Sequence, residues 1–238
     1  SWAPWMEELG ASFPVVAPDL LGHGESDAPL DPARYEAAAQ VDDLAALLDA
    51  LGIERAAVLG YSMGARLALA FAAACPERVT WLALESGGPG IAVEQDRAAR
   101  RASDGALAAR IEREGVRAFV DEWERLPIFA TQARLPVDAR ERLRRQRLRN
   151  RPEGLAGSLR GFGQGMQPDL HTALPGLAMP VLLLAGSVDG KYAALAREMA
   201  GGIPGAQAVI IDEAGHTPHL EQPERFRLEM RPFLDMGR

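Results

Sequence analysis

The sequence predicts an α/β protein with a mostly parallel sheet and helices on both faces of that sheet. Short apolar segments of strand length alternate with longer segments of amphipathic helical spacing along most of the 238 residues. The apolar segments are nearly continuous, as in strands that are covered on both faces. One long interruption, residues 88–174, has helical patterns and no strand pattern, and it predicts a helical insertion between two strands of the sheet.

The elements follow in chain order. "FPVVAPD", Phe13–Asp19, predicts a short buried strand before a glycine-rich turn. Apolar residues then recur at helical spacing over residues 35–51, and Gly52 suits the end of that helix. The remaining patterns predict strands over residues 55–60, 79–86, 180–186 and 206–212, and helices over residues 63–74, over residues 192–200 and from about residue 223.

This order predicts two parts, a core from residues 1–87 and 175–238 and a helical cap from residues 88–174. Charge divides the chain in a similar way. Residues 97–160 hold 16 arginines and 9 acidic residues, a balance of +7 within a chain whose net charge is −7. The acidic total argues against a nucleic-acid partner, whereas the local arginine excess leaves two interpretations: solvated helix faces, or contacts to an anionic ligand.

Several classes of protein are disfavoured by composition. No apolar run reaches the roughly 20 residues that a membrane-spanning helix needs, and no signal peptide is recognisable. One cysteine, Cys75, fits a reducing compartment, so we expect a cytoplasmic protein. No histidine and carboxylate cluster has metal-ligand spacing, and no glycine-rich dinucleotide motif follows a strand. The sequence therefore indicates neither a metal nor a cofactor.

The strongest motif is a serine between two glycines. Gly60-Tyr61-Ser62-Met63-Gly64 has the pattern G-x-S-x-G at the end of a predicted strand and the start of a predicted helix. This is the setting of a nucleophile elbow, a tight turn whose flanking positions must lack bulk and which holds the serine hydroxyl above the sheet. The amide of Met63, directly after the serine, is expected to help form an oxyanion hole near the positive end of the helix.

A serine hydroxyl needs a base to become reactive. His216 follows the last predicted strand, and Asp189 follows the strand before it, so Ser62, Asp189 and His216 have the chain order of an α/β-hydrolase triad. His219 is a weaker candidate for the base. Asp212 and Glu213 compete with Asp189 on charge alone, and for His23, in a turn, a structural hydrogen bond is expected.

Longer stretches suggest a narrower family. "GYSMGARLAL", "ESGGPGI", "RAARRASD", "DEWERLPIF", "MQPDL", "GSVDGKY" and "AGHTPHLEQP" together resemble the 2-succinyl-6-hydroxy-2,4-cyclohexadiene-1-carboxylate synthases of menaquinone (vitamin K2) biosynthesis. The resemblance covers nearly the whole chain. It implies a lyase of the α/β-hydrolase fold that eliminates pyruvate from 2-succinyl-5-enolpyruvyl-6-hydroxy-3-cyclohexene-1-carboxylate, a small polycarboxylate, without a cofactor. The triad would then act as a base.

The same resemblance implies a set of substrate-binding residues. Arginines of the elbow helix and of the cap would hold the three carboxylates, because a guanidinium pairs with a carboxylate through two hydrogen bonds. The positions that match are Tyr61, Arg66, Arg100, Trp123 and Arg147. Arg97 and Arg101 are alternatives to Arg100, and Arg149 is an alternative to Arg147.

The chain departs from the family pattern in two places. It begins at Ser1 with a segment that predicts a helix, so the earlier strands and a second oxyanion donor are expected in a longer natural chain. Ala65 stands where a second glycine often follows the elbow, and we expect it to be tolerated. Two other functions remain open: a serine hydrolase of carboxylesters or carbon–carbon bonds, and a catalytically silent binding protein. The oligomeric state is not predicted.

Overall fold

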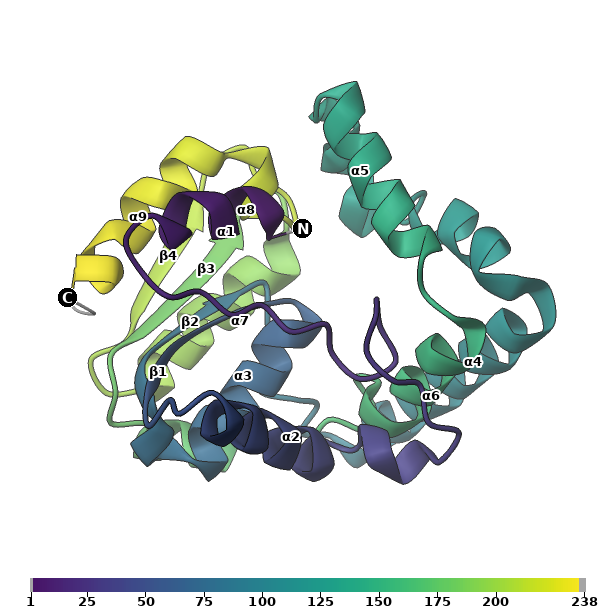
Figure 1. The fold of residues 1–238 in the computed structure, drawn as a ribbon, viewed down its shortest axis with the longest axis horizontal. Coiled ribbons are helices and arrows are strands. Elements are labelled where there is room, and N and C mark those ends of the chain that lie inside the picture. The colour runs from purple at the N-terminus through teal and green to yellow at the C-terminus, as the bar shows by residue number, and fades with distance from the viewer. Residues whose placement is uncertain (1, 236–238) are drawn as a thin grey trace.

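A parallel sheet of four strands forms the centre of the computed structural model, which describes residues 2–235 (Figure 1). The strands lie side by side in chain order, and each neighbouring pair is parallel. All four carboxyl ends therefore lie at one edge, where active sites of open α/β sheets are found. The strands are β1 (Ala56–Tyr61), β2 (Val79–Glu85), β3 (Val181–Gly186) and β4 (Gln207–Ile211).

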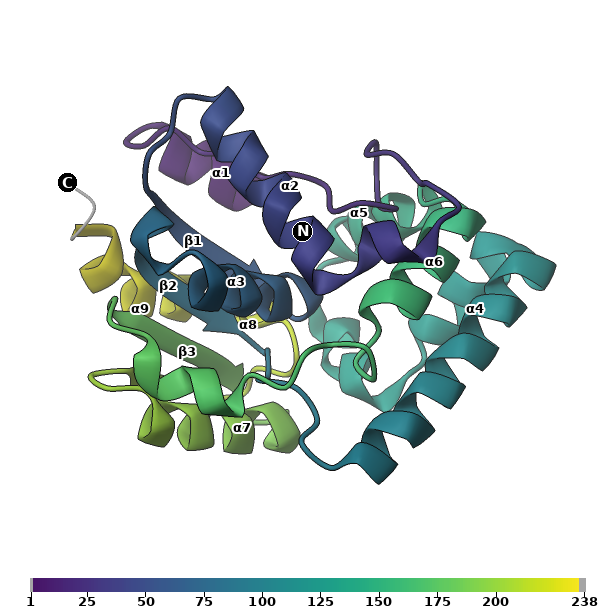
Figure 2. The same ribbon diagram turned by 90° about the horizontal axis from the view of Figure 1, so that it is seen from below.

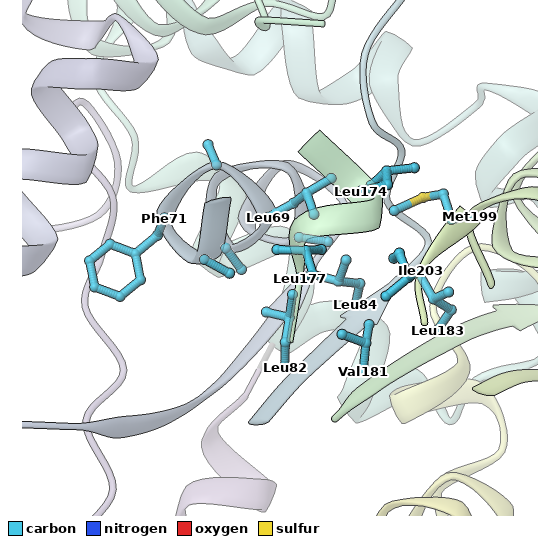
Figure 3. Packing of buried hydrophobic residues seen from close by; sticks show 14 of the residues in the cluster. Leu69, Phe71, Leu82, Leu84, Leu174, Leu177, Val181, Leu183, Met199 and Ile203 are labelled. Carbon is cyan, nitrogen blue, oxygen red and sulfur yellow. The ribbon is translucent and has the colours of Figure 1, made fainter. Parts of the chain in front are cut away.

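Helices cover both faces of the sheet, as the sequence predicts. One apolar cluster joins the sheet to α2 (Ala37–Ala50), α3 (Met63–Ala74) and α7 (Gly190–Gly202). The other cluster joins the opposite face to α1 (Ala3–Gly10) and α9 (Pro223–Asp235). Figure 3 shows the first cluster, in which leucines of α3 and of the strands pack together. This double cover explains why β2 and β3 are apolar along almost their whole length.

η2 (Pro76–Arg78) precedes β2, and the chain between β2 and β3, which the structure describes throughout, forms helices and no strand. The helices α4 (Glu94–Trp123), α5 (Val137–Leu148) and α6 (Pro152–Phe162) lie to one side of the sheet in both Figure 1 and Figure 2. Within this region α5 has no buried residue, and its Arg144 instead pairs with Asp121 and Glu124 of the preceding segment. The same region contains η3 (Pro127–Arg134) and η4 (His171–Gly176), and Leu174 of η4 packs in the apolar cluster of α3 and α7.

The prediction of a strand over residues 13–19 is wrong. This segment pairs with no strand in the described part of the chain, and Val16 is about half exposed. A strand exists only through hydrogen bonds to a neighbour, and β1 pairs with β2 alone among residues 2–235. The segment leads instead into a turn at Gly22 whose backbone packs against Gly154 of α6.

The helix predicted over residues 35–51 forms as η1 (Pro32–Tyr35) followed by α2. Gly52 follows its end with φ +68°, and its N–H donates to the Asp49 carbonyl at 3.0 Å, as predicted for a helix stop. Among the residues described, no helix combines the length and the apolar character that crossing a bilayer requires.

Candidate active site

Ser62 lies in the tight turn between β1 and α3. Its backbone has φ 51° and ψ −108°, a conformation that non-glycine residues rarely adopt, and its N–H donates to the Glu85 carbonyl of β2 at 2.8 Å. The sheet itself therefore holds the strained turn in place. The Arg66 N–H donates to the Ser62 carbonyl at 3.1 Å and closes the first turn of α3.

The two glycines of the motif differ in what they do. A Cβ on Gly60 would lie 2.4 Å from the Gly64 carbonyl oxygen and 2.6 Å from Cα of Ala65, so this position excludes any side chain. A Cβ on Gly64 would meet nothing within 4 Å. The expectation that both flanking positions must lack bulk is therefore right for Gly60 and wrong for Gly64, where the chain already follows the open helix surface.

Ala65, the departure from the family pattern, is accommodated by a glycine on the neighbouring strand end. Ala65 is 1% exposed, and a Cβ on Gly87 would lie only 2.5 Å from the Ala65 methyl carbon. The methyl group of Ala65 thus fills space that Gly87 leaves free. α3 approaches the end of β2 closely without a clash, as the sequence leads us to expect.

The structure brings the predicted serine, histidine and aspartate into one hydrogen-bonded chain. Ser62 Oγ lies 2.9 Å from Nε2 of His216, and Nδ1 of His216 lies 2.6 Å from Oδ2 of Asp189. The side chains of His216 and Asp189 are only 3% and 8% exposed. A carboxylate accepts only, so Nδ1–H donates to Asp189, and Nε2 is left to accept the Ser62 proton.

A glutamate that the sequence analysis does not single out holds the loop of His216. Oε2 of Glu221 accepts the Gly215 N–H at 2.7 Å, and Oε1 accepts the Thr217 N–H at 3.1 Å. Glu221 ends the short helix α8 (Pro218–Glu221), which begins two residues after His216. One carboxylate therefore fixes the backbone on both sides of His216. The sequence offers a signal for it, since Glu221 lies within the "AGHTPHLEQP" stretch.

The competing candidates have other partners. His219 contacts the carboxylate of Glu85, and both side chains are fully buried. A ring nitrogen of His23 contacts the Leu21 carbonyl at 3.2 Å, the structural role expected for it. In the described part of the chain, the carboxylate that His216 contacts belongs to Asp189, and not to Asp212 or Glu213.

Arg66 places a partly buried positive charge one helical turn from the serine. Its NH1 donates to the Phe162 carbonyl at 3.0 Å and to Oε1 of Gln167 at 3.5 Å, and its guanidinium lies 4.8 Å from the centre of the Phe162 ring. No acidic side chain pairs with it among residues 2–235. Burial lowers the pKa of Arg66 to about 10, so it remains protonated at neutral pH. An arginine in this state is suited to bind an anion.

Arg100 approaches the triad through intermediates. It pairs with the buried carboxylate of Asp104 at 2.8 Å, and it donates to Gln164, whose amide donates to the Tyr192 hydroxyl at 3.1 Å. The Tyr192 ring lies 4.8 Å from that of His216. The alternatives Arg97 and Arg101 both pair with Glu94, on the outer part of α4.

The one lysine of the chain also lies near the triad and was missed by the sequence analysis. Lys191 follows Asp189 by two residues, and its Nζ lies 5.2 Å from the centre of the Tyr192 ring. Desolvation, together with the nearby charge of Arg100, lowers the pKa of Lys191. Its position in "GSVDGKY" is the only sequence signal that could have identified it.

Aromatic residues of the helices between β2 and β3 form a row that ends at His216. The Trp123 ring lies tilted against that of Phe129, with ring centres 5.5 Å apart, and the Phe129 ring meets the His216 ring edge-on at 5.8 Å. Trp123 therefore reaches the triad through one intermediate ring. Tyr61 lies closer, with its ring 5.4 Å from His216 and its hydroxyl 3.4 Å from Oγ1 of Thr217, and burial raises its pKa.

Arg147, rather than Arg149, lies on the side of the site. Arg147 pairs with Glu124 at 3.0 Å and lies 5.4 Å from the centre of the Phe129 ring, at the wall of a cavity of about 600 Å³ beneath α5. Arg149 instead pairs with Glu25 at the exposed turn. No group of three or more histidine, cysteine, aspartate or glutamate side chains in the described residues could hold a metal ion.

Comparison with known proteins places this geometry in a family. The family model described as alpha/beta hydrolase fold matches residues 1–223. A protein of Bacillus subtilis (strain 168), provisionally named 2-succinyl-6-hydroxy-2,4-cyclohexadiene-1-carboxylate synthase, is 43% identical over 98% of this chain and 85% of its own. A Serratia proteamaculans (strain 568) protein of that name is 35% identical over 93% of this chain and 83% of its own.

A solved structure agrees with these sequence matches. MenH from S. aureus superposes with a TM-score of 0.94 and 34% identity, over 100% of this chain and 89% of that one. Matches of this extent and identity include the elbow, the helices between β2 and β3, and the His216 loop alike. The chain therefore belongs to the α/β-hydrolase fold family and, within it, to the 2-succinyl-6-hydroxy-2,4-cyclohexadiene-1-carboxylate synthases.

Proposed function

We propose that the protein eliminates pyruvate from 2-succinyl-5-enolpyruvyl-6-hydroxy-3-cyclohexene-1-carboxylate to give 2-succinyl-6-hydroxy-2,4-cyclohexadiene-1-carboxylate. The names of its relatives support the reaction. The observation that carries the proposal is the combination of a serine–histidine–aspartate chain with Arg66, a partly buried cation that lacks an acidic partner in the described region. A basic site next to an unpaired guanidinium suits proton removal from a polycarboxylate.

The proposed reaction begins with proton transfer. His216, oriented by Asp189, accepts the Ser62 proton, and the serine oxygen takes a proton from the ring carbon beside the succinyl carbonyl. The electrons of that C–H bond form an enolate, whose oxygen is stabilised by the Met63 N–H at the start of α3. Collapse of the enolate moves the ring double bond and breaks the bond to the enolpyruvyl oxygen. The pyruvate enol leaves with the proton from His216 and tautomerises to pyruvate.

The arginines are proposed to hold the carboxylates during this step. Arg66 is proposed for one carboxylate, Arg100 and Arg147 for the others, and Tyr61 and Trp123 for the walls of the site. Arg100 and Arg147 already pair with Asp104 and Glu124, so a substrate carboxylate must share or replace these partners. We further propose that residues 88–174 act as the cap over this site. A cytoplasmic location is consistent with the free cysteine Cys75.

The test measures pyruvate release from the enolpyruvyl substrate in wild type and in an Arg66→Met variant. Loss of a charge-assisted hydrogen bond to a carboxylate should lower kcat/KM by about 10- to 100-fold. Arg55→Met is the control, because Arg55 precedes β1 at the end far from Ser62 and donates to the Val79 carbonyl. If kcat/KM for pyruvate release is the same in Arg66→Met as in Arg55→Met, Arg66 is not the carboxylate ligand.

The same triad geometry also favours a second candidate, hydrolysis of esters through attack by Ser62 on a carbonyl carbon. The two reactions make different demands on Arg66, because a neutral ester such as p-nitrophenyl acetate has no carboxylate to bind. Rapid pyruvate release with weak hydrolysis of this ester supports the lyase. Rapid ester hydrolysis without pyruvate would support a hydrolase and contradict the proposed elimination.

A further inference from the structure

A chain of polar contacts runs from Arg147 of the cap to the residues beside Ser62 and His216. NH2 of Arg147 donates to Oε1 of Gln132 at 3.0 Å, and Nε2 of Gln132 donates to Oγ1 of Thr217 at 2.7 Å. Thr217 Oγ1 in turn lies 3.4 Å from the Tyr61 hydroxyl. Tyr61 directly precedes Ser62, and Thr217 directly follows His216. The chain therefore ends next to both partners of the proton transfer.

The chemistry of these side chains gives the chain a direction. A guanidinium only donates hydrogen bonds, so Arg147 fixes the oxygen of the Gln132 amide on its own side. The NH2 end of the amide must then face Thr217, which accepts from it. Between Thr217 and Tyr61 either hydroxyl can donate, because Oγ1 of Thr217 keeps a second lone pair. Arg147 thus determines which end of the Gln132 amide faces Thr217, although Arg147 and Thr217 lie 70 positions apart in the sequence.

Burial makes this arrangement costly to disturb. Gln132 is 7% exposed and Thr217 is 1% exposed, so water cannot readily replace a lost partner. The Thr217 backbone is also fixed, because its N–H donates to the carboxylate of Glu221. A change in the Gln132 contact therefore acts directly on the residue that follows His216, in a segment whose backbone Glu221 holds on both sides of that histidine.

We propose that Gln132 is a positioning residue that transmits occupancy of the Arg147 site to the Ser62–His216 pair. The inference rests on the proposed function, in which Arg147 binds a substrate carboxylate. At present Arg147 shares its guanidinium between Glu124 and Gln132. A carboxylate that binds Arg147 changes this sharing, and the amide of Gln132 carries the change to Thr217 and Tyr61. Occupied and empty sites then hold the proton-transfer pair differently.

The test compares two adjacent substitutions in η3. Gln132→Met keeps the size of the side chain and removes both hydrogen bonds, and we expect kcat for pyruvate release to fall about tenfold with little change in KM. Thr131→Val is the matched control, because Thr131 is equally buried and its hydroxyl has no hydrogen-bond partner within the described residues. A Gln132→Met kcat within about twofold of the Thr131→Val value, which is less than one hydrogen bond contributes, overturns the proposal.

Two further variants test whether the effect of Gln132 passes through its hydrogen bond to Thr217 or reflects general disruption of the site. Gln132→Glu keeps the contact to Arg147 but removes the donor to Thr217, so it should lose activity as Gln132→Met does. Thr217→Val removes the acceptor, and the double variant with Gln132→Met should be no slower than the slower single variant. Full activity of Gln132→Glu, or multiplied losses in the double variant, would contradict a directed chain through Thr217.

An activity-independent measurement completes the design. Proton NMR follows the downfield proton of the His216–Asp189 hydrogen bond while succinate, a simple dicarboxylate, is added. We expect succinate to shift this resonance in wild type and in Thr131→Val, and to lose most of that effect in Gln132→Met. An equal shift in Gln132→Met, or no shift in any of the three proteins, overturns the inference. Absence of pyruvate release by wild type refutes the proposed function instead, because the succinate experiment does not depend on the reaction.

Discussion

Both carboxylate oxygens of Glu85 contact Nδ1 of His219, at 2.9 and 2.8 Å, and neither side chain has any exposed surface. The backbone N–H of His219 donates to the same carboxylate at 3.0 Å. Glu85 ends β2, and its carbonyl accepts the Ser62 N–H, whereas His219 belongs to the short helix after His216. This buried pair therefore connects the turn of Ser62 with the segment of His216.

Replacing Glu85 by leucine should destabilise the fold strongly. The change leaves the His219 ring and backbone N–H groups buried without their acceptor, and breaking a buried pair in this way costs about 3–5 kcal/mol. Glu85→Gln should cost less, because the amide oxygen still accepts one hydrogen bond. Urea unfolding of the three proteins measures the difference. A loss below about 1 kcal/mol for Glu85→Leu, the range of exposed ion pairs, would contradict this account.

Glu221→Gln should reduce activity more than stability. A glutamine amide has one acceptor oxygen, so the Gly215 N–H or the Thr217 N–H loses its partner and the loop of His216 gains freedom. We expect kcat for pyruvate release to fall about tenfold. Glu198→Gln, an exposed change on α7, is the control for the altered charge. Equal kcat values for the two variants would show that the Glu221 carboxylate does not position the base.

The glycines that flank Ser62 should respond in opposite ways to alanine. Gly60→Ala places a methyl group 2.4 Å from the Gly64 carbonyl oxygen and should destabilise the protein by about 1–3 kcal/mol or more. Gly64→Ala meets open space in a helix and should stabilise it by about 0.5–1 kcal/mol. Thermal unfolding of both variants tests the contrast. Destabilisation by Gly64→Ala equal to that by Gly60→Ala would refute the assignment.

His23 should make the fold sensitive to mild acid. Burial lowers the pKa of its imidazole below 6.5, so the unfolded chain binds a proton more readily than the folded protein does. Its contribution to stability is therefore complete above pH 6.5 and decreases as the pH falls through that value. His23→Asn, which retains a donor for the Leu21 carbonyl, should show a smaller loss of stability between neutral and mildly acidic pH. Urea unfolding at several pH values across this range measures the free energy of unfolding of both proteins. The same dependence of this free energy on pH in wild type and His23→Asn would exclude His23 as the cause.

Sequence patterns were sufficient for the elements that depend on local periodicity and on burial. The helix after the elbow begins at Met63 and ends at Ala74 as predicted, and β3 lies within one residue of its predicted start. The order of Ser62, Asp189 and His216 also predicted which side chains meet, because parallel strands bring their carboxyl ends to one edge. The segment over residues 13–19 failed because its strand character requires a neighbour that local pattern does not reveal.

The supporting contacts of the site were not predictable in this way. Gln132 and Thr217 are separated by 85 positions, and neither belongs to a periodic pattern that would bring them together. The sequence indicated that Ala65 lies in a closely packed position, but it did not reveal that Gly87, after another strand, leaves space for the Ala65 methyl group. Sequence spacing favoured Arg147, but a shift of two residues would have selected Arg149, and their different partners, Glu124 and Glu25, separate them.

The helix α5, which buries none of its residues, is attached to its neighbours chiefly by charge. Its Arg144 and Arg147 pair with acidic residues of the preceding segment at partly exposed positions. Dissolved ions weaken such pairs, since charges are screened over about 10 Å at 0.1 M salt, whereas the apolar clusters on the sheet are not weakened. Ionic strength therefore acts selectively on this molecule: added salt loosens the wall that carries Arg147 and leaves the apolar packing on the two faces of the sheet intact.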